Sequence, residues 1–494
     1  MKKGYGVYGD VGVATLIVLG IAMVYISYIS AQLTALYQFG LAIISMVAIG
    51  IAITRIKSLN GAFGAYMIGG RSGIKFIDRL SRRHRRFWNA MAMWGLVLGF
   101  GLLTYPLLKG RLDKRIYLFG IFSIIVFVAV LLPNMLPALQ LIQLPQLQNV
   151  VSSASAAQGT PAVMGAEIIE TAVSAVLGFS GYVIIAILSN AVYIGSGIAA
   201  FMLSVAQGAP QISHVTQQVP SVAPLLPGID IPLIPGIIAL AFLLVVHEFS
   251  HGVLSRVYGI KIKSIGMLLF GVIPMGAYVE PDEKKVNKLD SLKQSKIFAA
   301  GVSANFIFAV IFFIPFMLSL MYLLPLVSTP GVYINNTLNG YPAAISGVQP
   351  GSRIISWNGH NVTNITAFED FAIASERPNA TVVLGTDKGN YTLKEVQYGS
   401  NSSKWIVGIS VIYKQIAPKS GFLDQLGFNL YATMAFLFML NFLVAVVNYL
   451  PIPGFDGWRI YKANIKNGRI VTALSLIVIV GLLLGVAPLV ANYL

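Results

Sequence analysis

The chain has 494 residues, of which 56% are hydrophobic and only 11% charged. This composition excludes an ordinary soluble protein and indicates a chain that lies largely in lipid. The net charge of +16 comes mainly from short basic segments beside apolar runs, which is typical of loops at a membrane surface and not of a nucleic-acid site. The chain has no cysteine, so a transition metal would need His, Asp or Glu ligands.

Eight apolar runs are long enough to cross about 30 Å of hydrocarbon, and a ninth is weaker. They lie near 11–30, 33–54, 88–108, 116–138, 231–256, 297–326, 427–450 and 470–493, with the weak run near 178–206. We therefore expect an α-helical polytopic membrane protein with about nine transmembrane helices. The first run is too long for a removable signal peptide and is expected to be a membrane anchor.

The N-terminal half is expected to consist of membrane helices in 1–138, with a basic cytoplasmic loop at 55–87, and of an insertion at 139–230 that holds the weak helix. The five basic residues from Arg82 to Arg86 place this loop inside by the positive-inside rule. A single span after it would put the basic segment 109–115 outside, against the same rule. Either the run 88–108 is a re-entrant hairpin or a short basic loop is tolerated outside, and the sequence leaves both open.

Residues 329–419 differ from the rest of the chain. Their apolar density drops, polar residues alternate with β-branched and aromatic ones, and Gly, Asn and Pro interrupt the runs, which predicts a β-rich domain inserted between two spans. The stretch 341–359, with a Pro-Gly and an Asn-Gly turn, resembles bacterial-type PDZ domains. The resemblance implies a groove near Gly331, Val332 and Tyr333 that captures an extended peptide. A PDZ-like fold that acts only as a steric plug is the alternative.

Glycosylation sequons give the expected orientation. The β-rich segment holds six N-x-[ST] sequences and the rest of the chain none, which favours an extracytoplasmic, N-glycosylated domain. Their asparagines are Asn335, Asn361, Asn364, Asn379, Asn390 and Asn401. The lysine-rich loop between 256 and 296 then lies on the cytoplasmic side, in agreement with the positive-inside rule.

The apolar run 231–256 contains the sequence His247-Glu248-Phe249-Ser250-His251. Positions four apart share a helix face, so the two imidazoles project toward one point, and Glu248 lies beside them within reach of a metal-bound water. Ionisable groups at membrane depth cost several kcal/mol unless they have a use or a partner. The spacing predicts two ligands of a catalytic metal and an adjacent base; hydrogen-bonded packing histidines are the alternative.

A catalytic zinc site normally takes three protein ligands and leaves the fourth position for water. The remaining histidines, His84, His214 and His360, fall outside the apolar runs. At the end of the run 427–450, two prolines and two glycines interrupt the helix between Asn448 and Gly457, which a bilayer tolerates only where the backbone lines a buried cavity. Asp456 is the one carboxylate there and becomes the candidate third ligand, with a plain helix-end turn as the alternative.

These two motifs and the PDZ-like insertion resemble the site-2 protease family of intramembrane zinc metalloproteases, and its archaeal members most closely. The stretch 271–283 adds to the likeness, which covers roughly 225–494, with a weaker likeness at 75–108. The resemblance implies zinc ligands His247, His251 and Asp456, with Glu248 as general base and acid. Segments 231–328 and 420–494 are then the two halves of the metalloprotease core.

The resemblance also implies a substrate and further site residues. Residues 300–305 occupy the place of a family motif written Gly-Pro-x-x-Asn, with Val302 in place of proline, so Asn305 would stabilise the oxyanion or hold the substrate; a packing amide is the alternative. The substrates would be transmembrane helices, cleaved in regulated proteolysis or in clearance of signal-peptide remnants. The strand-like segment 262–280 would pair with the unwound substrate. A noncatalytic PDZ-bearing scaffold and an ion-coupled transporter are the alternatives.

Overall fold

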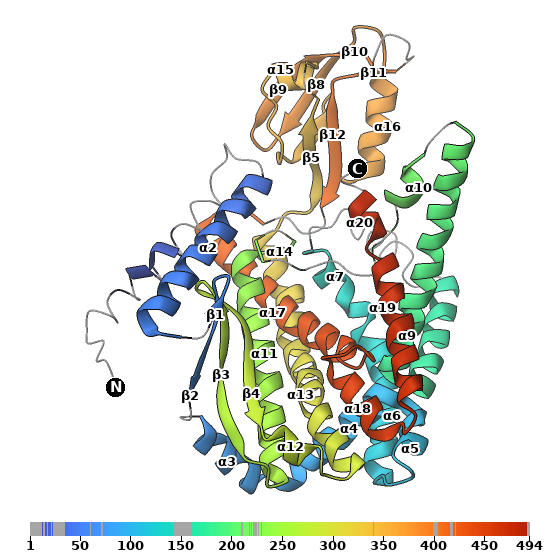
Figure 1. Cartoon of the computed structure of the whole chain (residues 1–494). Helices are drawn as coiled ribbons and strands as arrows, with labels where there is room; N and C mark the ends of the chain where they lie inside the picture. Colours follow the sequence, from blue (N-terminus) through green and yellow to red (C-terminus); the bar gives the residue numbers. More distant parts are fainter. Residues whose placement is uncertain are drawn as a thin grey trace. The chain divides into compact units, whose positions relative to one another are not determined.

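The computed structural model describes residues 35–142 and 161–491, with short gaps at 60, 71–72, 209–210, 217, 219, 221–224, 226, 229, 339, 399–403, 415–417 and 420, and a few positions between 12 and 22. The chain divides into two compact units. The membrane unit comprises 1–317 and 432–494, and the β-rich unit comprises 318–431. Each is described by itself (Figure 1).

The membrane unit is built mainly of helices. Before residue 143 these are α2 (Ala35–Lys57), α3 (Ile74–Arg83), α4 (Arg85–Phe100), η1 (Gly101–Leu103), α5 (Thr104–Leu107), α6 (Lys114–Val126), η2 (Phe127–Leu131), η3 (Pro133–Met135) and α7 (Leu136–Leu139). After residue 160 they are α9 (Pro161–Ala206), α10 (Ser213–Thr216), α11 (Leu233–Val257), α12 (Glu283–Val286), α13 (Ser291–Leu318), α17 (Phe422–Val447), α18 (Asp456–Asn464), α19 (Gly468–Leu484) and α20 (Ala487–Ala491).

Six helical segments in the described part of the chain are long and apolar enough to cross a membrane. They are Arg85–Leu107, Lys114–Leu131, Ile168–Ala206, Leu233–Val257, Ser291–Val327 and Phe422–Val447. The chain is therefore a multi-pass membrane protein. Helix α19 is apolar but shorter, and most of the expected run at 11–30 lies outside the described residues. The count of about nine spans stays a prediction.

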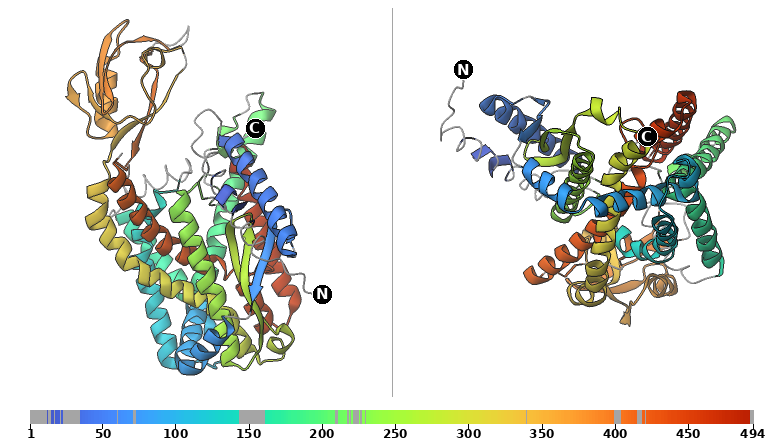
Figure 2. Two further views of the ribbon diagram at one scale, coloured as in Figure 1. Left: turned by 90° about the vertical axis from the view of Figure 1, so that its left-hand side faces the viewer. Right: turned by 90° about the horizontal axis from the view of Figure 1, so that it is seen from below.

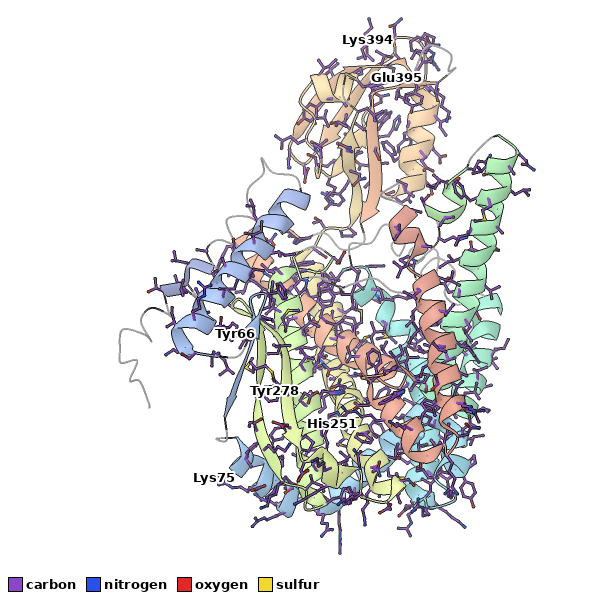
Figure 3. All side chains as sticks on the ribbon, in the orientation of Figure 1. Tyr66, Lys75, His251, Tyr278, Lys394 and Glu395 are labelled. Atoms are coloured by element: carbon purple, nitrogen blue, oxygen red, sulfur yellow. The ribbon has the colours of Figure 1, made fainter. Side chains whose placement is uncertain are left out.

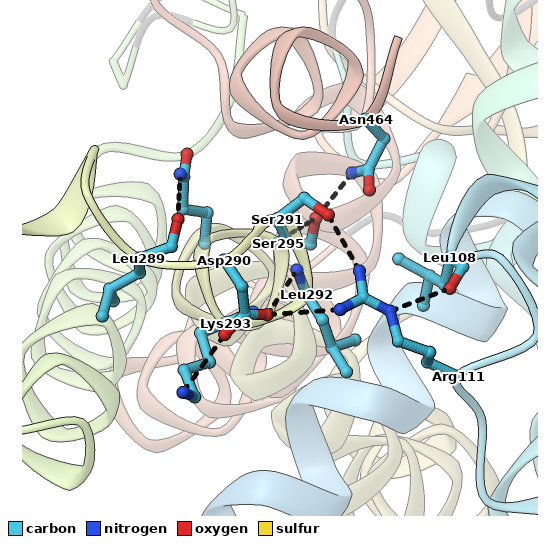
Figure 4. Close-up of polar contacts among 10 residues, drawn as sticks. Leu108, Arg111, Leu289, Asp290, Ser291, Leu292, Lys293, Ser295 and Asn464 are labelled. Carbon is cyan, nitrogen blue, oxygen red and sulfur yellow. Dashed lines mark hydrogen bonds and ion pairs between the residues drawn. The ribbon is translucent and has the colours of Figure 1, made fainter. Parts of the chain in front are cut away.

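The segment from α4 to α5 begins and ends at the same end of the membrane unit. Arg111, which follows α5, donates to the Ser291 hydroxyl at 3.0 Å and lies 3.6 Å from the Asp290 carboxylate, beside the start of α13 (Figure 4). Arg85 and Arg86, at the start of α4, line one pocket together with Arg111. Seen from below, α4 runs across the lower face of the unit (Figure 2). The structure thus supports the re-entrant alternative, and the basic segment 109–115 no longer conflicts with the positive-inside rule.

Glycines let α4 cross its neighbours at close range. A Cβ atom at Gly99 would lie 2.5 Å from the Tyr449 ring, and one at Gly101 or Gly178 would overlap the backbone of the other helix. Gly178 also has φ = 69° inside α9, a conformation that glycine adopts at little cost. Helix α9 begins at Pro161, well before the predicted weak run, because its small residues lower the hydropathy without disfavouring a packed helix.

A four-stranded antiparallel sheet lies beside α11 (Figure 1). Its strands, in spatial order, are β1 (Gly61–Ala62), β2 (Ala65–Gly70), β3 (Ile262–Phe270) and β4 (Ile273–Pro281). The predicted strand-like segment 262–280 therefore forms the hairpin β3–β4. Strand β4 is an edge strand that packs along α11, and among the described residues β3 is its one ladder partner.

The β-rich unit contains three small sheets, which pair as β12–β5, β7–β6–β8–β9 and β10–β11. Its elements are η4 (Ser319–Leu323), α14 (Leu324–Val327), β5 (Gly331–Thr337), α15 (Pro342–Ile345), β6 (Ile354–Trp357), β7 (His360–Asn361), α16 (Ile365–Ser375), β8 (Thr381–Thr386), β9 (Gly389–Lys394), β10 (Val396–Gln397), β11 (Trp405–Ile406) and β12 (Ile409–Lys414). The core of the unit forms around Val332, Ile354, Trp357 and Leu384.

Strand β5 carries the residues near which the PDZ resemblance implies a peptide groove. On one side it pairs with β12, from Gly331 to Thr337. On its other side Tyr333 forms a bridge with Arg353, and the Ile334 amide donates to the Ser352 carbonyl at 2.9 Å. The strand is therefore paired on both sides at Tyr333 and Ile334, which leaves little open edge for a peptide there.

Candidate metal centre

Helix α11 carries the His-Glu-x-x-His sequence, and its helical spacing places both imidazoles on one face. The Nε2 atoms of His247 and His251 are 3.1 Å apart. His251 donates from Nδ1 to the Ile297 carbonyl of α13 at 2.8 Å. This hydrogen bond fixes the tautomer and leaves Nε2 of His251 free to bind a metal, as is typical of metal-bound histidines.

Asp456 reaches the two histidines because the chain unwinds between α17 and α18. Three of the carbonyls freed by this unwinding have clear partners: Asn448 accepts from the Gly457 amide at 2.7 Å, Tyr449 accepts from the Ser180 hydroxyl at 2.9 Å, and Pro451 accepts from the Ser475 hydroxyl. Irregular backbone at membrane depth is stable only when its polar groups are satisfied in this way. The interruption places the carboxylate of Asp456, the first residue of α18, beside the face of α11 that carries the two histidines.

The three candidate ligand atoms form a triangle. Asp456 Oδ2 lies 3.1 Å from His247 Nε2 and 3.2 Å from His251 Nε2. Ligands held about 2.0–2.1 Å from a tetrahedral zinc ion stand roughly 3.3 Å apart, so the triangle has the size that three ligands of one ion require. Asp456 Oδ2 is buried and makes no hydrogen bond in the described part of the chain, as expected for an oxygen that completes its coordination with a cation. The nitrogen and oxygen donors fit zinc.

Asn305 lies behind His247 and away from the cavity. It is fully buried, and its side-chain amide lies 3.2 Å from His247 Nδ1. If a metal binds Nε2 of a neutral His247, the ring proton must be on Nδ1. The Asn305 side chain would then accept this proton through its oxygen. Rotating the amide by half a turn exchanges its oxygen and nitrogen and allows this. The structure thus places Asn305 where it can orient a candidate ligand, and Asn305 is not among the residues that line the cavity, so its oxyanion role stays a prediction.

Gly301 of α13 faces both imidazoles. A Cβ atom at this position would lie 2.5 Å from His251 Nε2 and 2.7 Å from the His247 ring. A glycine inside a helix costs about 1 kcal/mol relative to alanine, and here its missing side chain is what lets the imidazoles lie against α13. The face of α13 that packs on the metal centre therefore has no room for any side chain at position 301.

A cavity of about 820 Å³ opens beside the triangle. Glu248 lines it, and its carboxylate accepts a hydrogen bond from the Val279 amide of β4 at 3.4 Å. His251 and Tyr278 line the same cavity and lie at a similar level of the membrane unit (Figure 3). The cavity thus connects the candidate ligands with the edge strand of the sheet.

Two other carboxylates of the cavity wall are paired with basic residues. Glu280 accepts hydrogen bonds from the Ser264 hydroxyl at 2.9 Å and from Lys263 at 3.2 Å, and these bonds hold the pKa of its carboxyl below the usual range. Glu283 lies 3.6 Å from the Arg459 guanidinium. Glu248 differs from both because it accepts a hydrogen bond from a backbone amide and forms no ion pair with a basic residue among those that the structure describes.

Comparison with known proteins agrees with this geometry. The sequence profile of peptidase family M50 matches residues 235–487, just over half of the 494-residue chain. The match spans both segments that contribute to the triangle. The chain belongs to peptidase family M50.

Curated relatives of this M50 chain share its core. It is 33% identical over 234 residues to the uncharacterized protein MJ0971 of Methanocaldococcus jannaschii, covering 47% of this chain and 58% of that protein. Two proteins that carry the name "Putative zinc metalloprotease" are also similar. The one from Helicobacter pylori is 29% identical over 192 residues (33% of this chain, 52% of that protein), and the one from Clostridium acetobutylicum is 26% identical over 205 (36% and 58%). The chain spans between half and three fifths of the length of these relatives.

Several groups that hold the candidate ligands of this M50 chain in place were not predicted from the sequence. The Ile297 carbonyl that orients His251 has no side-chain signal at all. Gly301 was noted as part of a motif but given no role, although a glycine inside an apolar helix is itself a signal. The hydroxyls of Ser180 and Ser475, which bind the freed carbonyls, lie in distant helices and could not be paired with them from sequence.

Proposed function

We propose that this chain is an intramembrane zinc endopeptidase that cleaves transmembrane segments of membrane proteins. The observation that carries the proposal is the His247, His251 and Asp456 triangle with Glu248 in the adjoining cavity, inside a multi-pass chain of family M50. The names of the two bacterial relatives support zinc as the metal. The three triangle residues would be the ligands.

Glu248 would act as the proton carrier of the reaction. Zinc, when bound, polarises a water and the scissile carbonyl. Glu248 would take a proton from the attacking water and pass it to the leaving amine, a role that suits a carboxylate within reach of both. The Val279 amide holds one oxygen of Glu248 and so orients the other toward the cavity.

The edge strand β4 would hold the substrate. A transmembrane helix buries its carbonyls in its own hydrogen bonds, so it must unwind before one of them can be attacked. An unwound segment in a membrane needs new partners, and the open edge of β4 offers a row of backbone donors and acceptors along the cavity. Pairing at this edge would bring an extended segment past Glu248.

The orientation of the proposed protease follows from charge. The helix α3, the segment 109–115 and the loop before α13 each carry several basic residues and share one end of the membrane unit. The positive-inside rule makes this the cytoplasmic end of a cell-membrane protein. The β-rich unit would then be extracytoplasmic and N-glycosylated, since five of the six sequon asparagines are exposed and the sixth, Asn401, lies outside the described residues.

The β-rich unit would control which substrates reach the site. Because β5 is paired on both sides at Tyr333 and Ile334, a steric role for this PDZ-like unit is better supported than capture of a peptide at residues 331–333. Both regulated proteolysis and clearance of signal-peptide remnants fit a site that accepts a transmembrane segment.

The proposal is tested by zinc stoichiometry and cleavage measured together on the detergent-purified chain. His247→Ala and Asp456→Ala should each lose zinc and cleavage of a transmembrane test substrate, while the wild type holds one zinc per chain. His84→Ala and His360→Ala are matched controls outside the triangle and should change neither readout. A folded wild type that binds no zinc would overturn the proposal, as would Asp456→Ala with zinc and cleavage intact.

A further inference from the structure

A second pocket, of about 450 Å³, lies where α4, α6 and α13 meet. We call it the basic pocket. Its four basic residues come from three different parts of the chain: Arg85 and Arg86 from the start of α4, Arg111 from the segment before α6, and Lys296 from the second turn of α13. Cations that gather from separate elements form a built pocket, which distinguishes this group from a run of basic residues on one exposed helix.

Three of these cations form no ion pair with a described residue, although Asp290 lies near enough to Lys296 to interact with it electrostatically. Arg111 turns toward Asp290 and Ser291 (Figure 4). Asp113, the one carboxylate in the lining, caps α6 by accepting from two backbone amides at 2.9 and 3.4 Å. Arg85, Arg86 and Lys296 form no ion pair within the part of the chain that the structure describes.

The position of the two arginines adds to the positive potential of the basic pocket. Arg85 and Arg86 occupy the first turn of α4, at the positive end of the helix dipole, where basic residues are unfavourable. The residue before the helix, His84, supplies no side-chain hydrogen bond to the free amides of this turn. An anion bound here would relieve both the repulsion between the cations and the unsatisfied dipole.

Apart from Asn89, whose amide is bonded to the Arg85 carbonyl and the Tyr258 hydroxyl, the rest of the lining is apolar. Ala90 and Met93 of α4, Ile116 of α6 and Leu292 of α13 line the same pocket, and all three helices belong to candidate membrane spans. The basic pocket therefore joins a cationic rim to an apolar wall at one end of the membrane unit. We propose that it binds the phosphate headgroup of an anionic phospholipid, with the first part of an acyl chain along Met93 and Ile116.

A second basic cluster provides the comparison that separates a lipid site from general attraction to a membrane. Lys75, Arg79, Arg82 and Arg83 of α3 line another pocket, together with Asp78, but that lining has no apolar residue. The α3 cluster therefore offers cations to a lipid headgroup but no apolar surface to an acyl chain. A site that selects a phospholipid should depend on the basic pocket and much less on the α3 cluster.

The test measures lipid binding to the full chain, purified in a non-ionic detergent. A fluorescently labelled phosphatidylglycerol is titrated onto the wild type, the pocket variant Arg85→Gln/Arg86→Gln/Lys296→Gln and the charge-matched control Lys75→Gln/Arg82→Gln/Arg83→Gln. Each basic residue near an anionic headgroup contributes roughly a factor of five to binding at low salt. We expect about a 100-fold loss of affinity in the pocket variant and less than about fivefold in the control.

Labelled phosphatidylcholine and inorganic phosphate complete the design. Phosphatidylcholine, which has no net charge, should bind the wild type no better than the pocket variant, and inorganic phosphate at millimolar concentration should not displace the labelled lipid. Equal losses of phosphatidylglycerol affinity in the pocket variant and the control would overturn the proposal. They would show that the lipid is attracted to basic residues in general and not to this pocket. Full displacement by phosphate would overturn it in favour of a soluble anion.

Folding of the variants is checked by their zinc content, which the basic pocket should not affect. If the triple variant fails to fold, Lys296→Met tests the proposal alone, because methionine keeps most of the apolar stem and removes the charge. It should weaken phosphatidylglycerol binding about fivefold. Unchanged binding in this variant would refute a role for Lys296 and with it the pocket as described.

Discussion

The substitution Gly301→Ala tests the packing of α13 on the metal centre most directly. The added methyl group would lie 2.5 Å from His251 Nε2 and 2.7 Å from the His247 ring. Contacts below 3.0 Å essentially do not occur, so the His251 ring must retreat by about 0.5 Å, and by about 0.9 Å to reach an ordinary contact of 3.4 Å. Ligand distances in metal sites vary by only about 0.2 Å, so both imidazoles would leave their ligand positions.

The expected result is loss of zinc without loss of the fold. Changes that only disturb the supports of a ligand lower metal affinity about 10- to 100-fold, and this one displaces two ligands, so we expect at least about 100-fold, or roughly 2.7 kcal/mol. The apoprotein should not be destabilised, because its imidazoles can turn aside and alanine favours a helix by about 1 kcal/mol over glycine.

The assay is zinc affinity by chelator competition, with thermal unfolding of the apoprotein in parallel. Gly195→Ala is the matched control: Gly195 also lies in an apolar helix, α9, and a Cβ atom there meets nothing within 4 Å. It should keep zinc and cleavage at wild-type levels. Wild-type zinc affinity in Gly301→Ala would refute the reasoning, since the imidazoles could not then stand against α13 as the structure places them.

Three further predictions concern the reaction. Glu248→Gln should lower cleavage of a transmembrane substrate by about 10²- to 10⁴-fold while zinc content stays at one per chain; a noncatalytic scaffold would show no change. Gly276→Val should reduce cleavage about fivefold to tenfold by crowding the substrate edge of β4, with zinc intact, because a Cβ at Gly276 meets only the Leu268 side chain at 3.7 Å or more; zinc loss in step with cleavage would contradict this. Asn305→Leu should weaken zinc binding about 10- to 100-fold, whereas a fall in turnover at unchanged zinc affinity would favour an oxyanion role.

The parts of the site that could be predicted are those that a short stretch of sequence determines by itself. The i, i+4 histidines need only the period of a helix to meet, and the prolines and glycines around Asp456 disrupt any helix that contains them. The segment 262–280 was predicted to be strand-like, although not as the two strands β3 and β4 that it forms, and the drop in apolar density located the β-rich domain. These signals act within about ten residues and do not depend on how the chain packs.

The parts that could not be predicted depend on packing. Hydropathy cannot tell a re-entrant segment from a span, because both need an apolar surface. That the two ends of the segment from α4 to α5 lie close together follows only from long-range packing, as in the pocket that Arg85, Arg86 and Arg111 line. The role of Asn305 could not be decided either, since an amide in an apolar run suits a substrate contact and a ligand support equally well. Its burial beside His247 favours a ligand support, and the Asn305→Leu variant tests this.

The metal centre depends on positions where a helix has no side chain. Gly301 lets α13 approach the imidazoles, Gly99 lets α4 approach the Tyr449 ring, and Gly457 lets the start of α18 approach the Tyr449 carbonyl. The hydrophobic effect does not press helices together in lipid, so their spacing must come from close contact and buried hydrogen bonds. Hydroxyl and amide groups then satisfy the backbone that this packing exposes, as Ser180 does for Tyr449. Adding a single methyl group at one of these glycines should therefore lower the zinc affinity of this chain, although it hardly changes the hydropathy of the helix.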